Sequence, residues 1–236
     1  MKTEILYEDN EILVIYKPEG LAAQSARVTQ PDVESELRTY LKGRSVFLVH
    51  RLDQPVEGLM VIAKTKSSAA SLSGQIRNGS LKKTYFAVVA KDEGAAKDIP
   101  KEWTEVTDYM VKDAGTAKAE ILDGDTGAGE KAVKATLFYR RIGEAKGDTA
   151  LIEIHLITGR FHQIRAQMAH QGMPLLGDAK YGSEKSREVT GELARQIPLG
   201  SAALCAYKLE FLHPKTKKEM HFEIKPHKPV FNSYEI

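Results

Sequence analysis

A short charged segment separates two apolar runs near residue 50. The segment belongs to FLVHRLDQPVEGLMVIAKT, residues 47–65, and contains Arg51 and Asp53. Charged side chains are seldom fully buried without a partner, so this interruption needs a physical reason. A carboxylate held at such a position can attack carbon as a nucleophile or accept a proton as a base. Asp53 is therefore the first candidate for chemistry in this sequence.

A second reading of the same segment pairs Asp53 with Glu57, as the two carboxylates of a glycoside hydrolase would be paired. Pro55 and Gly58 disfavour a helix across this stretch, so no regular element aligns the two acids. No second motif in the chain carries an acid suited to this role. The hydrolase reading is therefore the weaker one.

A metal site built from histidines is also a weak hypothesis. The candidates are His155, His162 and His170. His162 and His170 are eight residues apart and lack a ligand partner at helical i,i+4 spacing. We interpret these histidines as surface residues and expect no metal.

Arg165 lies in a second charged interruption, within the predicted helix 160–172 (RFHQIRAQMAHQG). The apolar stripe of this helix is made of Phe161, Ile164, Met168 and Ala169. Arg165 falls inside the stripe, and an unpaired buried guanidinium would cost several kcal/mol. Asp53 needs a cation, so we hypothesise that Asp53 and Arg165 meet. The alternative is that Arg165 reaches out to solvent while Asp53 merely opens a turn.

Several strands and a few helices must position these groups. In the first part of the chain, hydrophobic periodicity and turn residues predict strands within 4–18 (a pair with a turn at Asp9-Asn10) and at 45–49, 58–65 and 81–90, with helices at 32–43 and 67–80. We expect Ser67 or Ser68 to cap the second helix. The turn KPEGL, residues 17–21, follows the first strand pair.

The second part of the chain is also rich in strands. We expect strands at 105–111, 119–122, 132–142, 149–157, 202–209 and 220–224, a helix at 186–197, and loops at 91–104, 123–130 and 174–182. Many strands with few, scattered helices indicate an α+β fold with a mixed, mainly antiparallel sheet.

Composition is that of an ordinary soluble globular protein. The 236 residues are 42% hydrophobic and 28% charged, with a net charge of +2, which neither requires nor excludes a nucleic-acid partner. Cys205, the only cysteine, excludes an internal disulfide and fits a reducing, cytoplasmic location; we expect it to be buried. We see no signal peptide and no run near the ~20 apolar residues that span a membrane.

Four motifs, in order, resemble those of the RluA-type pseudouridine synthases. They are KPEGL (17–21), HRLD (50–53) with a strand led by Gly58 and the later Lys64, LKKTYFAVV with Tyr85, and LITGRFHQIRAQMAHQGMPLLGDAKYG (156–182). The resemblance covers nearly the whole chain. One departure is that Val56 and Glu57 stand where family members often have Thr-Ser, which bears on the shape of this turn and on substrate choice.

The resemblance implies a fold as well as an activity. It implies a pseudouridine synthase sheet with flanking helices, in which residues 1–236 form a single catalytic domain of two half-sheets sharing one central cleft. We expect no S4-type RNA-binding domain ahead of it. The family reaction breaks the uracil N1–ribose C1′ bond, turns the base and rejoins it through C5, without redox change. It therefore implies no cofactor.

The resemblance also assigns roles to individual residues. Asp53 would attack C1′ or take the 2′ proton, and both routes stay open. Tyr85 would pack against the uracil and help to remove the C5 proton. Arg165 would keep Asp53 ionised, Leu156 would line the pocket, and Arg51 would fill the space left by a flipped base. His50, which alternation turns away from Arg51 and Asp53, is interpreted as a structural hydrogen-bonding residue.

RNA is the expected partner. Basic residues gather at 64–66, 77–83, 215–218 and 225–228, and each cluster could equally be solvated surface. Arg77, Lys82 and Lys83 are the first candidates for RNA contacts because they closely precede Tyr85. Both rRNA and tRNA remain open as substrates, and the alternative function is a non-catalytic RNA-binding or ribosome-assembly protein with the same fold.

Overall fold

The computed structural model describes residues 1–25, 30–92, 99–122, 132–195 and 201–235. The chain divides into two compact units. Unit 1 consists of Met1–Thr84 and Cys205–Pro226, and unit 2 of Tyr85–Leu204 and His227–Ile236. The loop predicted at 123–130 lies outside the described residues.

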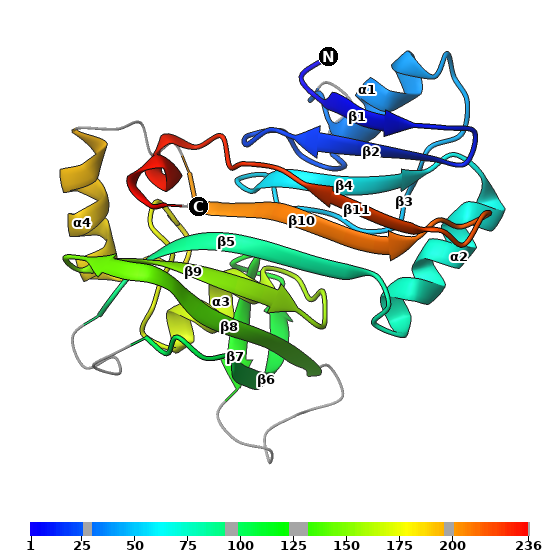
Figure 1. Ribbon diagram of the computed structural model, residues 1–236. Coiled ribbons are helices and arrows are strands. Elements are labelled where there is room, and N and C mark those ends of the chain that lie inside the picture. Colours follow the sequence, from blue (N-terminus) through cyan, green and yellow to red (C-terminus); the bar gives the residue numbers. More distant parts are fainter. Residues whose placement is uncertain (26–29, 93–98, 123–131, 196–200, 236) are drawn as a thin grey trace. The chain divides into compact units, whose positions relative to one another are not determined.

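Unit 1 is built on a mixed sheet. Its strands are β1 (Glu4–Glu8), β2 (Ile12–Lys17), β3 (Phe47–Leu48), β4 (Glu57–Ala63), β10 (Leu204–Leu212) and β11 (Glu219–Glu223). They run in the order β1-β2-β4-β10-β11, with β3 also paired to β4 (Figure 1). Only the short β4–β10 pairing is parallel among these, because Cys205 and Ala206 lie opposite Glu57 and Gly58.

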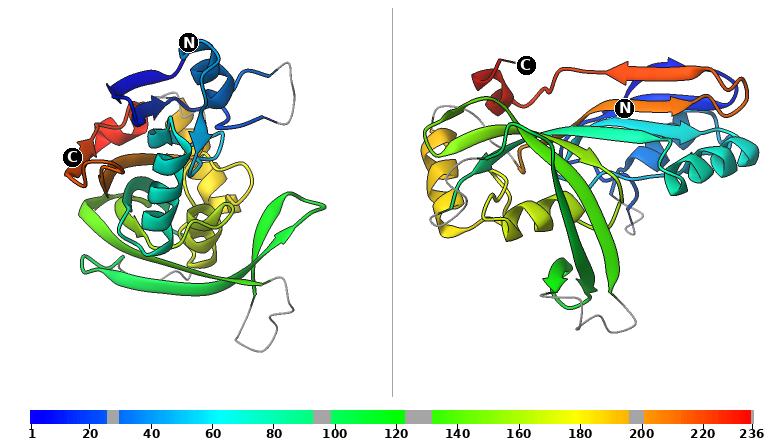
Figure 2. Two further views of the ribbon diagram at one scale, coloured as in Figure 1. Left: turned by 90° about the vertical axis from the view of Figure 1, so that its right-hand side faces the viewer. Right: turned by 60° about the horizontal axis from the view of Figure 1, so that its bottom comes forward.

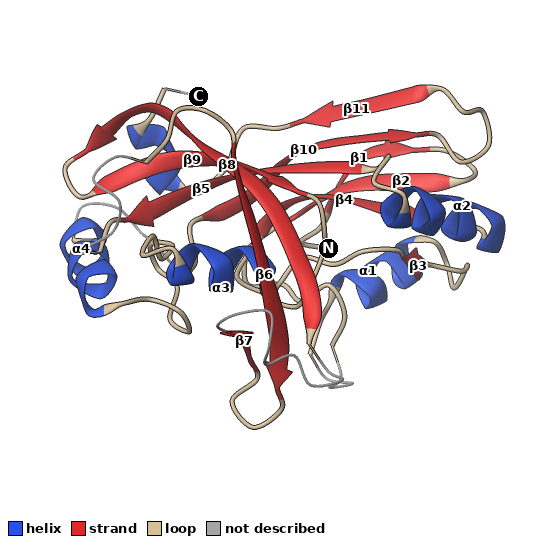
Figure 3. Cartoon of the chain, turned by 90° about the horizontal axis from the view of Figure 1, so that it is seen from below, coloured by secondary structure: helices blue, strands red, loops and turns tan. Residues whose placement is uncertain are grey.

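Two helices cover one side of this sheet (Figure 3). They are α1 (Val33–Tyr40), capped by Asp32, and α2 (Lys66–Arg77). Leu72 of α2 belongs to a core cluster with strand residues such as Ile12, Val61 and Phe211. The helix cap is Thr65, whose hydroxyl accepts the N–H of Ser68, so the expectation that Ser67 or Ser68 caps α2 is wrong.

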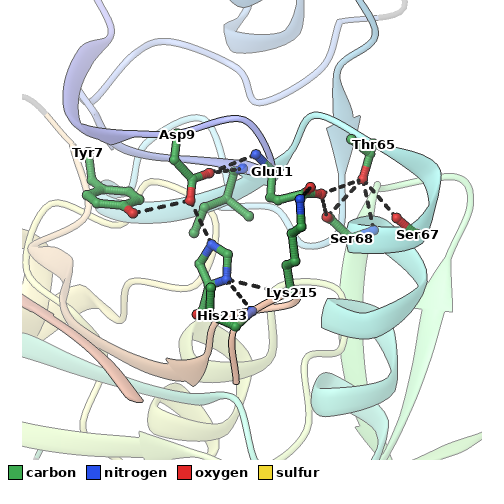
Figure 4. A network of polar contacts seen from close by, with 10 residues as sticks. Tyr7, Asp9, Glu11, Thr65, Ser67, Ser68, His213 and Lys215 are labelled. Carbon is green, nitrogen blue, oxygen red and sulfur yellow. Dashed lines mark hydrogen bonds and ion pairs between the residues drawn. The ribbon is translucent and has the colours of Figure 1, made fainter. Parts of the chain in front are cut away.

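A polar network ties three connections of unit 1 together (Figure 4). Asp9, in the β1–β2 turn, accepts the backbone N–H groups of Glu11 and Ile12 at 2.8 Å each and contacts Nε2 of His213 at 2.7 Å. Nδ1 of His213 accepts two backbone N–H groups of the β10–β11 connection, so Nε2 carries the ring hydrogen. Glu11 accepts the hydroxyl of Ser68 in α2. The network therefore fixes the ends of these elements.

Unit 2 contains a second set of strands. They are β5 (Lys82–Ala90, whose first three residues belong to unit 1), β6 (Thr104–Asp113), β7 (Lys118–Leu122), β8 (Val133–Lys146) and β9 (Thr149–Leu156), in the order β5-β9-β8-β6-β7. The β6–β7, β6–β8 and β8–β9 pairs are antiparallel. Helices α3 (Gln163–His170) and α4 (Glu184–Ala194) lie on one side of this sheet, and a 3-10 helix, η1 (Pro229–Ser233), closes the chain (Figure 2).

The fold class matches the expectation from the sequence. Both units carry mixed or antiparallel strands with few helices, which confirms the α+β prediction. Helix α3 starts at Gln163, three residues later than expected, because His162 adopts a left-handed conformation (φ 54°) that cannot continue a helix. Cys205 is buried as predicted. Among the described residues, no helix combines the length and apolar character needed to cross a membrane.

Candidate active site

The segment between β3 and β4, residues 49–56, carries Asp53 and is called the Asp53 loop below. His50 lies near its start, and Nε2 of its ring accepts the backbone N–H of Val61 in β4 at 3.1 Å. Leu48, the last residue of β3, pairs with Ile62 of β4, and Val61 is the next residue of β4 toward the Asp53 loop. The His50 side chain therefore supplies a hydrogen bond to β4 just beyond the end of β3. The interpretation of His50 as a structural hydrogen-bonding residue is confirmed.

The KPEGL turn holds the Asp53 loop from the other side. Lys17 is 0% exposed. Its ammonium donates to three carbonyl oxygens, those of Pro18 (2.9 Å), Leu21 (2.7 Å) and Gln54 (3.4 Å). Gln54 also accepts the N–H of Gly20 at 2.8 Å and donates its side-chain amide to the Gly20 carbonyl at 3.0 Å. Gln54, the residue after Asp53, is therefore held to the turn by three hydrogen bonds.

Asp53 itself is half-buried, and Arg51 is exposed. The Asp53 carbonyl accepts the N–H of Val56 at 3.0 Å, which closes a tight turn directly after the candidate carboxylate. That the side chains of Arg51 and Asp53 point to the same side of this segment stays a prediction.

Glu57, one of the two residues that stand in place of the usual Thr-Ser pair, makes a buried contact. Glu57 is buried and accepts the hydroxyl of Tyr16 at 2.6 Å. Burial, followed by this hydrogen bond to the carboxylate, raises the pKa of Tyr16 far above its usual value. Because this carboxylate is engaged inside unit 1, the structure disfavours Glu57 as the second acid of a glycoside hydrolase.

Gly58 is required by the close approach of β10. It has φ 129°, and a Cβ at this position would lie 2.4 Å from the carbonyl oxygen of Ala206. Any side chain would collide with backbone that cannot move without breaking the β4–β10 pairing.

Unit 2 supplies a buried ion pair in α3. Arg165 donates from Nε and Nη2 to the two carboxylate oxygens of Asp178, each at 2.7 Å, and both side chains are almost fully buried. Burial alone would raise the pKa of Asp178. The Arg165 hydrogen bonds and charge, together with the backbone N–H groups of Lys180 and Tyr181, outweigh burial and hold the pKa below its usual value.

Two sequence predictions about Arg165 fare differently. The prediction that Arg165 faces the core and needs a carboxylate is confirmed, and Asp178 is a partner that the periodicity could not find because it lies in the loop 174–182. Asp53 belongs to unit 1 and Arg165 to unit 2, so their pairing stays a prediction.

The segment before α3 differs from the expectation. Phe161 is 39% exposed rather than part of the apolar stripe, because it precedes the helix. His162 is buried and contacts the hydroxyl of Tyr181 at 2.9 Å, so the surface interpretation is wrong for His162, whereas His170 is exposed. The described part of the chain contains no group of three or more metal-binding side chains.

The remaining predicted site residues lie on strands or near strand ends. Tyr85 on β5 and Leu156 at the end of β9 are both buried in unit 2. Arg77 and Lys82 are exposed in unit 1. Lys83, however, is only 8% exposed. Every residue of β5 from Lys83 to Ala90 is buried, so alternation along the strand does not distinguish Lys83 from Lys82.

The chain belongs to the RNA pseudouridylate synthase family, because the model of that family matches residues 11–170. The resemblance to the RluA-type synthases is confirmed.

Two similar proteins are named ribosomal large subunit pseudouridine synthase C. That of Buchnera aphidicola subsp. Baizongia pistaciae is 32% identical over 217 residues, covering 92% of this chain and 64% of that protein. That of Rickettsia conorii is 35% identical over 183 residues, covering 77% and 57%. The chain thus spans less than two thirds of the length of these two relatives. Ribosomal large subunit pseudouridine synthase D of Zymomonas mobilis is 30% identical over 229 residues, covering 93% and 68%.

Solved structures support the fold. Human RNA Pseudouridylate Synthase Domain Containing 4 superposes with a TM-score of 0.71 at 24% identity, over 95% of this chain and 89% of that one. Human RNA Pseudouridylate Synthase Domain Containing 1 gives 0.70 at 19% identity, over 95% and 83%. These similarities agree with the α+β pseudouridine synthase fold.

Proposed function

We propose that this chain is an RNA pseudouridine synthase that converts specific uridines to pseudouridine without a cofactor. The observation that carries the proposal is Asp53 itself, a half-buried carboxylate on a loop held by Lys17 and His50, within the segment that matches the family. A group held in one geometry suits a reaction whose barrier depends on orientation.

The proposed reaction is an isomerisation that balances without a co-reactant. The N1–C1′ bond breaks, C5 of the uracil bonds to C1′, and the C5 proton is lost as N1 gains one. Asp53 would attack C1′ or remove the 2′ proton, and Tyr85 would assist removal of the C5 proton. Arg165 would favour the ionised form of Asp53.

Further parts of the proposal concern how the uridine is reached. The target base must leave its stack, at a cost of a few kcal/mol, and Arg51 would occupy the vacated space while Leu156 contacts the flipped nucleotide. Arg77, Lys82 and Lys83 would contact the RNA. We further propose that residues 1–236 act as a single catalytic domain, with the two units sharing one cleft.

We propose large-subunit rRNA as the substrate, with tRNA as the alternative. The names of the similar proteins, ribosomal large subunit pseudouridine synthases C and D, favour rRNA. Single-stranded loops whose bases can be splayed out are the expected targets.

The direct test uses purified wild-type protein, Asp53→Ala and Asp53→Asn on large-subunit rRNA transcripts labelled with tritium at uracil C5. Wild type should release tritium as pseudouridine forms. Both variants should lose more than about a thousandfold in rate, while binding RNA nearly as well, because a group that reacts only in the transition state contributes little to binding. Asp148→Asn, at a half-exposed position in unit 2, is the matched control and should react as wild type. Wild-type rates in Asp53→Ala would refute the assignment.

A different outcome would favour the second function. If wild type binds rRNA but forms no pseudouridine in rRNA or tRNA, the chain is better described as a non-catalytic RNA-binding or ribosome-assembly protein.

A further inference from the structure

Phe161, which lies shortly before α3, is an exposed aromatic residue that the proposed reaction does not use. It is 39% exposed, and its ring stacks on that of His162, with the centroids 3.8 Å apart and the planes 20° from parallel. Single exposed apolar side chains are common on protein surfaces, so exposure alone indicates no function. The groups that surround this ring, all of them in unit 2, are more informative.

The support behind the Phe161 ring is held by the fold. His162 is buried, and its Nδ1 contacts the Tyr181 hydroxyl at 2.9 Å. That hydroxyl also accepts the backbone N–H of Ala119 in β7 at 2.7 Å. Tyr181 packs against a core cluster that contains Ala119 of β7 and Ala166 of α3. One face of the Phe161 ring is therefore backed by groups that are fixed to neighbouring elements.

A cation covers the other face of this ring. Lys112 of β6 places Nζ 4.7 Å from the Phe161 ring centroid, and because His162 occupies one face, the ammonium lies over the opposite one. Lys112 is exposed. A cation over an aromatic ring at an exposed site is a weak contact, and lysine has a flexible four-carbon stem. An entering planar group can therefore displace the ammonium from the ring.

Two more exposed lysines lie next to these aromatic rings. Nζ of Lys118 is 6.0 Å from the centroid of the Tyr181 ring, and Nζ of Lys180 donates to the carbonyl of Ala117, in the β6–β7 turn, at 3.0 Å. Within the described part of the chain, neither these two lysines nor Lys112 forms an ion pair. The surface beside the Phe161 ring therefore has three ammonium groups.

The acidic residues of the β6–β7 hairpin do not cancel this charge. Glu120 of β7 pairs with the residue before Lys112, so strand alternation directs Glu120 to the other face of the hairpin. Both carboxylate oxygens of Asp113 accept hydrogen bonds from the residues of the turn itself. Asp108, on the same face as Lys112 but four residues away along β6, accepts the side-chain amide of Gln167 at 2.7 Å.

We propose that Phe161 is a stacking platform for one base of single-stranded RNA, and that Lys112, Lys118 and Lys180 bind the phosphates on either side of that base. The identity of the ligand as RNA rests on the proposed function. An aromatic ring beside cations is the arrangement that binds single strands whatever their sequence, because every base has a π-face and every nucleotide a phosphate. The base would replace the Lys112 ammonium over the ring, and the ammonium would move to a phosphate oxygen. A base inside a duplex is already stacked, so double-stranded RNA does not fit this site.

The first experiment separates stacking from charge. Binding of a single-stranded 12-nucleotide oligouridylate is measured by fluorescence anisotropy over a range of salt concentrations. Phe161→Leu keeps an apolar side chain but has no ring, so it should bind about 5- to 100-fold more weakly at every salt concentration, with the salt dependence of wild type. Phe161→Tyr should bind as wild type. Lys112→Met should lower the slope of log affinity against log salt by about 0.7, the value for one phosphate contact on a single strand.

Trp103 provides the matched control. It is 42% exposed and has the guanidinium of Arg140 over its ring at 4.6 Å, so it is a second exposed aromatic residue with a cation on its face. It directly precedes β6, nine residues and about 30 Å along the strand from Lys112. Trp103→Leu should change neither affinity nor salt dependence. Wild-type affinity in Phe161→Leu, an equal loss in Trp103→Leu, or no binding of the oligonucleotide by wild type would overturn the platform.

The second experiment detects the stacked base itself. Oligouridylates that contain one 2-aminopurine are bound to wild type and to Phe161→Leu at saturating protein, so that a difference in affinity has no influence. Stacking quenches the fluorescence of this base. Wild type should quench it and Phe161→Leu should quench it much less, whereas the same RNA in a duplex should show no difference between the two proteins. Equal quenching by both proteins would contradict the proposal.

The two proposals fail in different ways. If wild type forms pseudouridine while Phe161→Leu binds single-stranded RNA normally, the platform is wrong and the proposed function stands. If binding of single strands depends on Phe161 but no RNA is isomerised, the platform stands and the enzymatic function fails.

Discussion

At the scale of single residues, hydrophobic periodicity predicts which side chains are buried better than it predicts their partners. The position of Arg165 inside an apolar stripe correctly predicts a buried guanidinium that needs a carboxylate. Its observed partner, Asp178, lies in an irregular loop, and no periodic rule assigns loop residues to a neighbour. The structural role of His50 follows from strand alternation, whereas the burial of Lys83 is hidden by the charged run around it.

The Arg165–Asp178 pair gives a prediction about stability. Arg165→Met should lower the free energy of unfolding by about 3–5 kcal/mol, because Asp178 then remains as an uncompensated buried charge. Arg165→Met/Asp178→Leu should be less destabilised than the single variant. The exposed pair of Arg38 and Glu34 is a matched control, and Arg38→Met should cost less than about 1 kcal/mol in urea unfolding. An Arg165→Met protein as stable as wild type would show that the pair contributes nothing.

His50 gives a prediction about pH. The pKa of His50 is about 3 in the folded protein, whereas its ordinary value is 6.5. Between these two pH values the unfolded chain binds a proton at His50 and the folded chain does not. The free energy of unfolding should therefore fall as pH drops from 6.5 toward 5, by up to about 1.4 kcal/mol per pH unit from this group. His50→Gln should lack this part of the slope. Parallel pH curves for the two proteins would contradict the assignment.

At the scale of elements, the type of element was easier to predict than its ends. The strands β4 and β5 and the helix α2 follow from apolar periodicity and flanking turn residues. The start of α2 does not, because Thr65, Ser67 and Ser68 all offer a hydroxyl and only the backbone conformation decides between them. Thr65 is extended (φ −126°), so it is the cap. The left-handed His162 likewise delays α3 in a way that no sequence rule shows.

Gly58 provides the prediction at this scale. Gly58→Ala should lower the free energy of unfolding by about 3 kcal/mol or more, because it combines an unfavourable φ with a clash against the Ala206 carbonyl. Gly74→Ala in α2 is the matched control, since its Cβ would meet nothing closer than an Arg77 nitrogen at 3.9 Å. That control should be neutral or stabilising by up to about 1 kcal/mol. Equal effects of the two substitutions in denaturant unfolding would show that the β10 approach does not require glycine.

For the whole molecule, the α+β class and the family follow from the sequence, but the division into units does not. Two of the three unit boundaries fall inside strand β5, between Thr84 and Tyr85, and at the start of β10, between Leu204 and Cys205. Neither of these two positions has the polar, Gly- or Pro-rich composition that marks a linker, whereas the third boundary, between Pro226 and His227, lies in such a stretch. The order of the four motifs identifies the family because each motif keeps its place along the chain, whatever the contacts between units.

The most direct test of the central claim maps pseudouridine across the large-subunit rRNA of a strain that lacks the gene. The strain is complemented with wild-type protein or with Asp53→Ala, expressed to equal levels. We predict that one or more uridines lose their modification in the deletion strain, regain it with wild type, and stay unmodified with Asp53→Ala. Restoration of those pseudouridines by Asp53→Ala would contradict the account.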